Sequence, residues 1–538
     1  MSLPLSRLDR REAPDSRELR PWHALAEVLL VFGVFCLVGA WPVPDVNEPY
    51  YLGRAIHFWK PDWAQGDFFL QTADSHTGFC LAFGWLSLWL GPTALAWTGR
   101  LLTWGLLAWA WQRMSFAFLP RPGMAVLTAA LFVTLQESCQ MAGEWVVGGV
   151  EAKGFAYALV FLGLEALAQD RWNRMWMLFG GAAFFHVLVG GWSTVAAAIA
   201  WLTLGSRRPP VRSFRWGLVG GLLLSLPGVM PSLRLTLGTD LESASQAWMI
   251  YVFERLAHHL DPTRFRFALV ARFLSLLACW LFLCWLIPAA PREVRLRRFV
   301  GGALIVALLG AGLGAMRFCC PAIAASLLRF YWFRLADVAV PLGVAITSVS
   351  TVCWHSQRWP RLARAALAAL ALLAVYNLVW YGCKRAVPQQ PRADKWVRYA
   401  DWRDVCDWIA HAGVIPPKAR FLTPRGAQTF KWYTGRAEVV TWKEIPQDAT
   451  SILAWRRRLE DIYGPRSEDV GSCWVRPLIC QGTQRLRQLG KKYQADFLLT
   501  RLPQEEPVPE VALELLYANS SYAVYRLDGR GSAGAHVP

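Results

Sequence analysis

Long apolar runs separated by short arginine clusters constrain the fold of this 538-residue chain more than any other feature. A helix rises about 1.5 Å per residue, so about 18 apolar residues are enough to cross the ~30 Å hydrocarbon core of a bilayer. Runs near or at this length occupy residues 23–41, 124–136, 216–230, 268–288, 299–316, 335–353 and 363–382. The chain is also 55% hydrophobic, above the ~45–50% of soluble domains. This pattern predicts an α-helical protein that crosses a membrane many times.

The net charge of +18 comes mostly from arginines that lie between the apolar runs. The clusters are Arg7, Arg10, Arg11, Arg17 and Arg20; Arg113 and Arg121; Arg171 and Arg174; Arg207, Arg208, Arg212 and Arg215; Arg292, Arg295, Arg297 and Arg298; Arg358, Arg361 and Arg364. Cytoplasmic loops of membrane proteins are enriched in this way. A nucleic-acid-binding protein would instead gather its charges on one face, interleaved with aromatic residues. We therefore expect a lipid bilayer as partner and no nucleic acid.

Placing every arginine cluster in the cytoplasm gives one path with about eleven spans. The predicted spans are 23–41, 95–112, 123–140, 154–169, 175–189, 190–205, 214–230, 267–288, 299–316, 335–353 and 363–382. This path gives a basic cytoplasmic N-terminus at 1–22, a membrane domain at 23–384 and a large first outer loop at 42–77. Residues 78–94 are expected to form a helix at the outer surface, because another span there would break the arginine pattern. The first run is interpreted as an uncleaved span, since no small-residue cleavage site follows it before Pro42.

The chain changes character after about residue 385, where charges become frequent and apolar runs shorten. Residues 401–411 and 449–463 favour helices, whereas 419–423, 437–442, 495–500 and 522–527 favour strands. The alternation predicts a small extracytoplasmic α/β domain at 385–530, followed by a disordered tail at 531–538. The 12 cysteines form no CxxC pair. Cys473 and Cys480 would form a disulfide only if this domain lies in an oxidising compartment, and would otherwise be free thiols.

Two carboxylates follow the first predicted span directly. Asp45 and Glu48 lie three residues apart at the expected membrane surface. Such a pair can supply a general base and a second group that orients it or binds a metal. The alternative is an ordinary acidic loop, in which Asn47 caps a helix and Pro49 occupies its first turn.

A second polar segment lies between the third and fourth predicted spans. It contains Glu144, Glu151 and Lys153, with Gly148 and Gly149 between the two acids. Ionisable residues at membrane depth are costly and therefore suggest a functional site. The competing interpretation is an ion pair between Glu151 and Lys153 in a hydrated loop.

A third group is scattered over several outer ends of spans. His186 lies near the end of one span, while Arg317, Arg329 and Arg334 lie between the ninth and tenth spans. Arginine on the outer side runs against the general trend, and a guanidinium matches the geometry of a phosphate. Alternatively, these arginines pair with lipid headgroups or with Asp337. The sequence contains no Walker A, HExxH or GxSxG motif, which disfavours ATP-driven transport, zinc proteolysis and serine-hydrolase chemistry.

The order of these features resembles the GT-C superfamily of membrane glycosyltransferases, which use polyprenyl-phosphate-linked sugars as donors. The resemblance rests on one span, a large outer loop that opens with DVNEPYYL, a surface helix, many spans and a terminal α/β domain. The terminal segment, with LTPRGAQTFKWYTGRAEVVTWKEIPQD and LAWRRRLEDIYG, is similar to the C-terminal domain of uncharacterised bacterial proteins of this type. The resemblance implies a bacterial inner-membrane protein of the cell envelope, with its N-terminus in the cytoplasm and its C-terminal domain outside.

The resemblance also implies roles for individual residues. Asp45 is at the position of the catalytic base, and Glu48 is the other candidate. Four further residues are candidates for binding the donor phosphate on the predicted topology alone: Lys153, His186, Arg317 and Arg329. Three residues are candidates for support of the site: Tyr50, Glu144 and Glu151. The sequence has Asp-x-Asn-Glu where a DxD motif would suggest a metal, so no metal or other cofactor is assigned and a divalent ion is left open.

The implied activity moves a sugar from a polyprenyl-phosphate donor to a lipid, glycan or protein acceptor on the outer face. One alternative is a non-catalytic scaffold or glycan-binding protein, in which Lys431, Trp432, Tyr433 and Arg436 would meet the glycan. A packed α/β domain needs such aromatic residues in any case. A transporter or flippase would require ionisable residues near span centres and an inverted repeat, and the sequence shows neither clearly.

Overall fold

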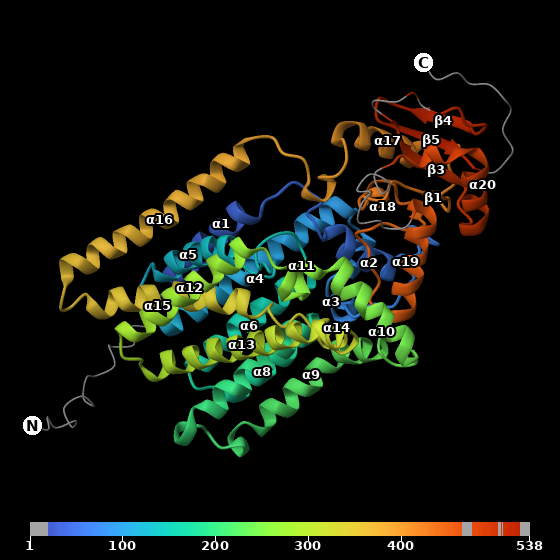
Figure 1. Cartoon of the computed structure of the whole chain (residues 1–538). Helices are drawn as coiled ribbons and strands as arrows, with labels where there is room; N and C mark the ends of the chain where they lie inside the picture. Colours follow the sequence, from blue (N-terminus) through green and yellow to red (C-terminus); the bar gives the residue numbers. More distant parts are fainter. Residues whose placement is uncertain (1–19, 465–475, 504–506, 508, 528–538) are drawn as a thin grey trace, which may run out of the picture.

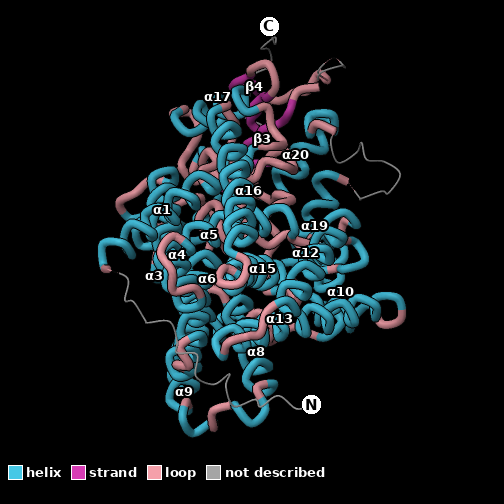
Figure 2. The backbone as a smooth tube through the Cα atoms, turned by 90° about the vertical axis from the view of Figure 1, so that its left-hand side faces the viewer, coloured by secondary structure: helices cyan, strands magenta, loops and turns pink. Residues whose placement is uncertain are grey.

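The computed structural model describes residues 20–464, 476–503, 507 and 509–527. Most of the basic N-terminus, Cys473 and the predicted disordered tail at 531–538 lie outside these described residues. Long helices pack side by side, and a small sheet lies at one end of them (Figure 1). The view turned by 90° also shows the strands confined to this end (Figure 2).

Each of the eleven predicted spans coincides with a helix. These helices are α1 (Pro21–Gly39), α4 (Pro92–Phe118), α5 (Met124–Cys139), α6 (Ala152–Ala168), α7 (Trp172–Phe185), α8 (Val187–Thr203), α9 (Arg215–Arg234), α12 (Phe267–Leu286), α13 (Pro291–Ala315), α15 (Ala336–His355) and α16 (Pro360–Ala386). Among the described residues, six helices are long and apolar enough to cross a membrane, or seven if α8 and the bent segment 205–213 form one span. The chain is therefore a helical membrane protein, whereas the count of about eleven spans stays a prediction.

Proline marks the start of several of these helices. Pro21, Pro92, Pro291 and Pro360 each occupy the first helical position. A proline there costs nothing in hydrogen bonding, because the first turn of a helix leaves its N–H groups without helical partners. The prolines therefore fix where α1, α4, α13 and α16 begin.

Helices α7 and α9 pack with their backbones in direct contact. A Cβ added at Gly180 would lie 2.0 Å from the carbonyl oxygen of Gly221, and one added at Gly217 would lie 2.4 Å from backbone atoms of Asn173. The side chain of Asn173 accepts a hydrogen bond from the amide of Gly217 at 2.7 Å. Close approach through small residues is typical of helix pairs in membranes, where lipid removes the hydrophobic drive for association.

In the part of the chain that the structure describes, the arginine clusters between helices lie at the end of the bundle away from the sheet (Figure 1). Glu165 near the end of α6 pairs with Arg113 of α4 at 2.5 Å and with Arg174 of α7 at 3.2 Å. Arg295 of α13 pairs with Asp170 at 3.3 Å. Helix α16 starts beside the last cluster and runs towards the sheet (Figure 1). The side of the membrane on which these clusters lie stays a prediction.

Short helices of the first loop lie over the other ends of the bundle. They are α2 (Glu48–Trp59), α3 (Thr77–Ala82) and a tight turn of helix at Gly84–Leu88. A Cβ at Gly78 would lie 2.1 Å from the carbonyl oxygen of Phe184, so α3 rests directly on the end of α7. Residues 78–94 were expected to form one surface helix. The structure instead has two short pieces and the start of α4, none long enough to add a span before α4.

The C-terminal domain contains one five-stranded sheet with the order β2-β1-β3-β5-β4. The strands are β1 (Arg420–Leu422), β2 (Ala437–Glu438), β3 (Phe497–Arg501), β4 (Glu514–Ala518) and β5 (Tyr522–Arg526). Strand β1 runs parallel to β2 and β3, whereas β5 is antiparallel to β3 and β4. The helices are α17 (Tyr399–His411), α18 (Phe430–Thr434), α19 (Ala449–Tyr463) and α20 (Gly482–Tyr493). The segment 437–442 forms a strand over only two residues, and β4 was not predicted.

Two buried ion pairs attach this domain to the first loop. Lys431 of α18 pairs with Asp67 at 3.3 Å, with Glu438 at 2.6 Å and with Glu444. Its ammonium lies inside the protein, so the interpretation of Lys431 as a packed residue is preferred over one in which it meets a glycan. Arg392 pairs with Asp45 at 2.6 Å. The C-terminal domain is therefore fixed over the helix ends by charge pairs that the first loop supplies.

Candidate functional site

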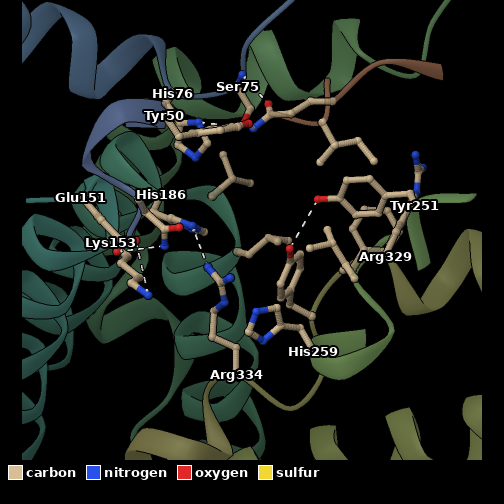
Figure 3. A pocket seen from close by; sticks show the side chains of 18 of the residues that line it. Tyr50, Ser75, His76, Glu151, Lys153, His186, Tyr251, His259, Arg329 and Arg334 are labelled. Atoms are coloured by element: carbon tan, nitrogen blue, oxygen red, sulfur yellow. Dashed lines mark hydrogen bonds and ion pairs between the residues drawn. The ribbon is translucent and has the colours of Figure 1, made fainter. Parts of the chain in front are cut away.

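A cavity of about 290 Å³ lies where the helix ends meet the C-terminal domain. Its walls come from α2, from the segment 142–153, from the junction of α7 and α8, and from residues 443–447 of the C-terminal domain. Further parts of the wall come from α10 (Leu241–Met249), from the segments that follow α10 and α14 (Pro321–Leu328), and from residues 75–76 and 232–236. Polar side chains converge on it from all of these elements (Figure 3).

One wall carries the acidic residues. The ammonium of Lys153 lies between Glu144, at 3.6 Å, and Glu151, at 3.4 Å. The same ammonium lies 3.8 Å from the ring centre of Trp145. Asn47 donates a hydrogen bond to Glu151 at 3.1 Å. Burial raises the pKa of the Glu151 carboxyl above its ordinary value, although Lys153 opposes this shift. A carboxylate tuned in this direction is a better proton acceptor near neutral pH.

His186 and Arg334 lie beside this acidic wall. The Nη1 of Arg334 donates to Nε2 of His186 at 2.8 Å. The guanidinium of Arg334 also lies 3.2 Å from Glu144, measured from its Nε. Because Nε2 accepts from a cation, His186 is neutral in this arrangement. On this wall the two acids, Glu144 and Glu151, thus lie next to the cations Lys153 and Arg334, and the neutral imidazole of His186 lies next to Arg334.

Arg329 lies across the cavity from Lys153 and Glu151 (Figure 3). Its guanidinium carbon lies 4.0 Å from the ring centre of Trp248 and 4.7 Å from that of Phe330. Its Nε donates to the carbonyl oxygen of Ser326 at 3.0 Å. Aromatic faces hold a guanidinium without neutralising its charge. Within the described residues no carboxylate pairs with Arg329, so its charge is available to a ligand.

Arg255 and Lys443 connect the cavity wall with the C-terminal domain, to which Lys443 belongs. Arg255 donates to the carbonyl oxygens of Trp442, at 2.9 Å, and of Lys443, at 3.2 Å. The side chain of Lys443 lines the cavity. Burial, followed by repulsion from Arg255, lowers the pKa of Lys443 to about 7. Sequence reasoning missed this residue, because the predicted strand at 437–442 ended one position before it.

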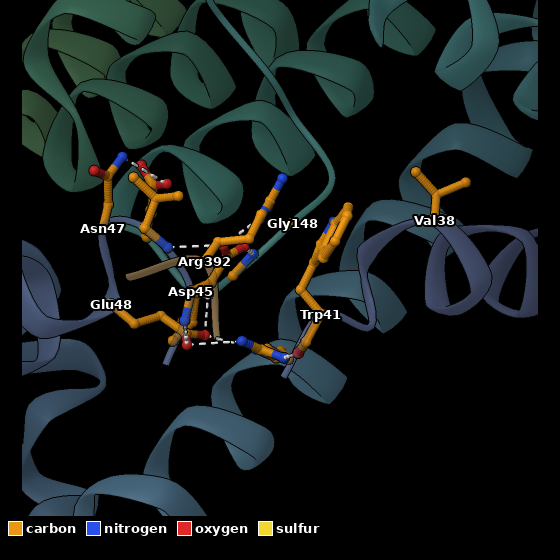
Figure 4. Close-up of polar contacts among 12 residues, drawn as sticks. Val38, Trp41, Asp45, Asn47, Glu48, Gly148 and Arg392 are labelled. Carbon is orange, nitrogen blue, oxygen red and sulfur yellow. Dashed lines mark hydrogen bonds and ion pairs between the residues drawn. The ribbon is translucent and has the colours of Figure 1, made fainter. Parts of the chain in front are cut away.

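The two predicted catalytic residues, Asp45 and Glu48, lie in a network of polar contacts (Figure 4). Glu48 is fully buried and accepts from Arg100 at 2.6 Å and 2.7 Å. It also accepts from the amides of Asp45, at 2.6 Å, and Val150, at 3.0 Å. Its oxygens are thus occupied by one arginine and two backbone groups.

Asp45 is held in the same way. It accepts from Arg392 at 2.7 Å and 2.6 Å, and from the amides of Val46, at 2.7 Å, and Gly149, at 2.9 Å. Neither Asp45 nor Glu48 is among the residues that line the cavity. Their role as catalytic base stays a prediction, and their described contacts are those of groups that fix the first loop against residues 149–150.

The other predicted residues divide between the cavity and its surroundings. Lys153, His186 and Arg329 line the cavity, as do the supporting residues Tyr50, Glu144 and Glu151. The hydroxyl of Tyr50 accepts a hydrogen bond from Gln447 of the C-terminal domain at 3.1 Å. Arg317 does not line the cavity. It pairs with buried Asp261, and its guanidinium lies 4.7 Å from the ring centre of Phe253.

A resident metal was left open by the sequence. In the part of the chain that the structure describes, no group of three or more His, Cys, Asp or Glu side chains could hold a metal ion. The two acids of the cavity are each paired with a cation, which is not how oxygen ligands of Mg²⁺ or Ca²⁺ are arranged. Whether the protein needs a divalent metal ion stays open to a measurement of metal binding.

Comparisons with known proteins complete the description. The family model "Domain of unknown function (DUF6798)" matches residues 400–462, within the C-terminal domain. No curated protein matches the chain. Among solved structures, the chain is similar to an oligosaccharyltransferase from Archaeoglobus fulgidus, described as a complex with Zn and sulfate. The match has 11% identity and a TM-score of 0.43, and covers 89% of this chain and 67% of the archaeal one.

Proposed function

We propose that this protein is a membrane glycosyltransferase of the GT-C type. It moves a sugar from a polyprenyl-phosphate donor to an acceptor on the outer face of the membrane. The observation that supports the proposal is the cavity at the helix ends, where buried carboxylates lie next to an excess of cations. A position at the ends of the apolar helices would suit a substrate carried by a lipid, and residues 443–447 of the C-terminal domain form part of the cavity wall.

The charges of the cavity suit transfer from a lipid phosphate. The acceptor hydroxyl must lose a proton as it attacks the anomeric carbon, and a carboxylate can accept that proton. The bond that breaks leaves negative charge on the lipid phosphate, which positive groups aimed at it stabilise. The five basic side chains that line the cavity are Lys153, Arg255, Arg329, Arg334 and Lys443, and the two acidic ones are Glu144 and Glu151. The excess of positive charge favours an anionic ligand.

Within this proposal, Glu151 is the carboxylate best suited to be the base. It lines the cavity, burial raises its pKa, and among the described residues it forms an ion pair with Lys153 alone, at 3.4 Å. Asp45 is the competing assignment, because the family resemblance matches it to the base. Asn47 lies between the two and donates to Glu151, so the first loop contributes to the site under either assignment. Glu48 then acts by positioning this loop through Arg100.

The test uses the purified protein in nanodiscs with a panel of radiolabelled polyprenyl-phosphate sugars. We expect the wild type to transfer or hydrolyse one donor, and Glu151→Gln to lose about 100-fold or more of that rate. Exposed Glu242→Gln is the matched control and should keep full activity. Thermal unfolding of each variant shows whether a loss is chemical or structural.

The remaining outcomes separate the assignments. Loss of turnover in Asp45→Asn, with unchanged unfolding and an active Glu151→Gln, would assign the base to Asp45 instead. Loss in Glu48→Gln accompanied by a lower unfolding temperature would support a positioning role. A wild type that neither binds nor turns over any donor of the panel would refute the glycosyltransferase and leave a scaffold or glycan-binding protein.

A further inference from the structure

The C-terminal domain places a cation, Lys443, on the cavity wall, and no carboxylate among the described residues forms an ion pair with it. Lys443 lies in the segment after β2, and this segment lies within residues 400–462 that match the family of unknown function. No ion pair or hydrogen bond of its ammonium is present among the described residues. This contrasts with Lys431 of the same domain, whose ammonium contacts three carboxylates.

The surroundings of Lys443 are mostly positive. Arg255, Lys395 and Lys153 repel its charge, whereas Glu151 attracts it. Burial, followed by repulsion from Arg255 and Lys443, also lowers the pKa of His258 to about 4. Burying a cation beside like charges is unfavourable unless another group compensates for it. The missing compensation is what an anionic ligand in the cavity would supply.

The backbone around Lys443 is fixed in a way that holds the side chain there. Arg255, from the segment after α10, donates to the carbonyl oxygens of both Trp442 and Lys443. Its guanidinium also lies 5.3 Å from the ring centre of Trp442. Arg255 therefore fixes the backbone of this segment by hydrogen bonds, while the side chain of Lys443 lines the cavity, where it can contact a ligand.

We propose that Lys443 binds the phosphate of a polyprenyl phosphate in the cavity, so that the C-terminal domain supplies part of the ligand site. The identity of the ligand rests on the proposed function, whereas the anion site rests on the unneutralised cation itself. In this arrangement the phosphate lies between the helix ends and the C-terminal domain, in the cavity that Lys443, Glu144 and Glu151 all line. The domain of unknown function is then a ligand-binding part of the protein and not only a cover.

The test measures binding apart from catalysis. Farnesyl phosphate, a short and soluble polyprenyl phosphate, is titrated into the full-length protein in detergent by calorimetry, with farnesol as the uncharged probe. We expect Lys443→Gln to weaken farnesyl phosphate binding at pH 6.5 by about tenfold or more, as for loss of a charged hydrogen bond. Farnesol binding should not change. Lys418→Gln, at an exposed lysine of the same domain, is the matched control and should bind like the wild type.

A second variant gives a readout that a purely structural role would not move. The pKa of Lys443 near 7 means that the free protein loses this charge as the pH rises, while arginine stays charged. Wild-type affinity should therefore fall between about pH 6.5 and 8.5 relative to that of Lys443→Arg measured at the same pH. Comparing the two proteins at each pH cancels the titration of the phosphate itself.

The outcomes separate this inference from the proposed function. Equal affinities in the wild type and Lys443→Gln, or identical pH profiles in the wild type and Lys443→Arg, would overturn the inference. So would a wild type that does not bind farnesyl phosphate. Binding that depends on Lys443 without any sugar transfer would keep the inference and reject the enzyme. Sugar transfer at full rate in Lys443→Gln would keep the enzyme and reject the inference.

Discussion

Replacing Lys431 by methionine should loosen the attachment of the C-terminal domain more than any other single change to its interface. The ammonium of Lys431 is the shared partner of Asp67, Glu438 and Glu444, and all four side chains are at most 2% exposed. Methionine keeps most of the length and volume of lysine, so packing changes little. The substitution therefore isolates the loss of the charge, which leaves three carboxylates buried together.

The magnitude follows from how buried ion pairs respond to removal of one partner. Such a change costs about 3–5 kcal/mol, because the remaining charge is buried without compensation. We expect the lower part of this range near neutral pH, because burial raises the pKa of Glu438 to about 8 and this carboxyl is then largely protonated. Adding Glu438→Gln and Glu444→Gln should restore most of the loss. Asp67 would then remain as the single charge, hydrogen-bonded to the amides of Leu70 at 3.0 Å and of residue 438 at 3.1 Å.

Hydrogen exchange of the full-length protein in detergent measures this attachment locally. The relevant amides are those of residues 67–70 and 437–440, where the first loop meets β2. A loss of 3–5 kcal/mol in the opening free energy should speed their exchange by about a hundredfold to a thousandfold or more. Exchange in α4, far from the network, serves as the internal control. Exchange at residues 67–70 within about threefold of the wild type would refute the argument that the carboxylates need this ammonium.

Three further predictions concern the same interface and the bundle. Burial raises the pKa of Glu438 from 4.5 to about 8, so its protonated form stabilises the folded state below pH 4.5 and this stability is lost as the pH rises towards 8. Exchange at residues 437–440, corrected for intrinsic rates, should therefore report up to about 1.4 kcal/mol of lost stability per pH unit, and Glu438→Gln should remove the dependence. Gly221→Val should lower the unfolding temperature and the yield of folded protein, because its Cβ would lie 2.5 Å from a backbone oxygen of Trp176. Gly220→Val is its control, since there the nearest atom, at 3.3 Å, belongs to a flexible methionine side chain. Arg100→Met should cost about 3–5 kcal/mol by leaving Glu48 unpaired, and equal unfolding curves for this variant and the wild type would contradict the description of a buried pair.

The helices were predictable because their signals are local. Apolar length, arginine clusters and helix-starting prolines such as Pro92 and Pro360 each act within a few residues. They located all eleven predicted ranges on helices without knowledge of how the helices pack. Strand β4 was missed because its residues are only half-buried, so its pattern lacks the apolar alternation on which strand prediction depends.

The candidate site was predictable only in part, because its geometry depends on partners far apart in sequence. The sequence identified the acidic segment with Glu151 and Lys153, and both line the cavity. It could not show that Asp45 pairs with Arg392, 347 residues away. The sequence around a carboxylate near a membrane surface does not show whether its side chain lines a cavity or pairs with an arginine outside the cavity. Lys443 was invisible for the opposite reason, since its importance depends on the absence of a partner.

The long separation between Asp45 and Arg392 has a consequence for how the protein is made. Asp45 is synthesised early, and its arginine partner follows 347 residues later. Asp67 is likewise synthesised long before Lys431, with which it forms an ion pair. Until the end of the chain emerges, both carboxylates must stay hydrated at the helix ends, because an unpaired charge cannot be buried cheaply. The helices can therefore assemble first, while the finished cavity comes into being only after translation has passed α18, and a prematurely terminated chain would carry an open and acidic first loop.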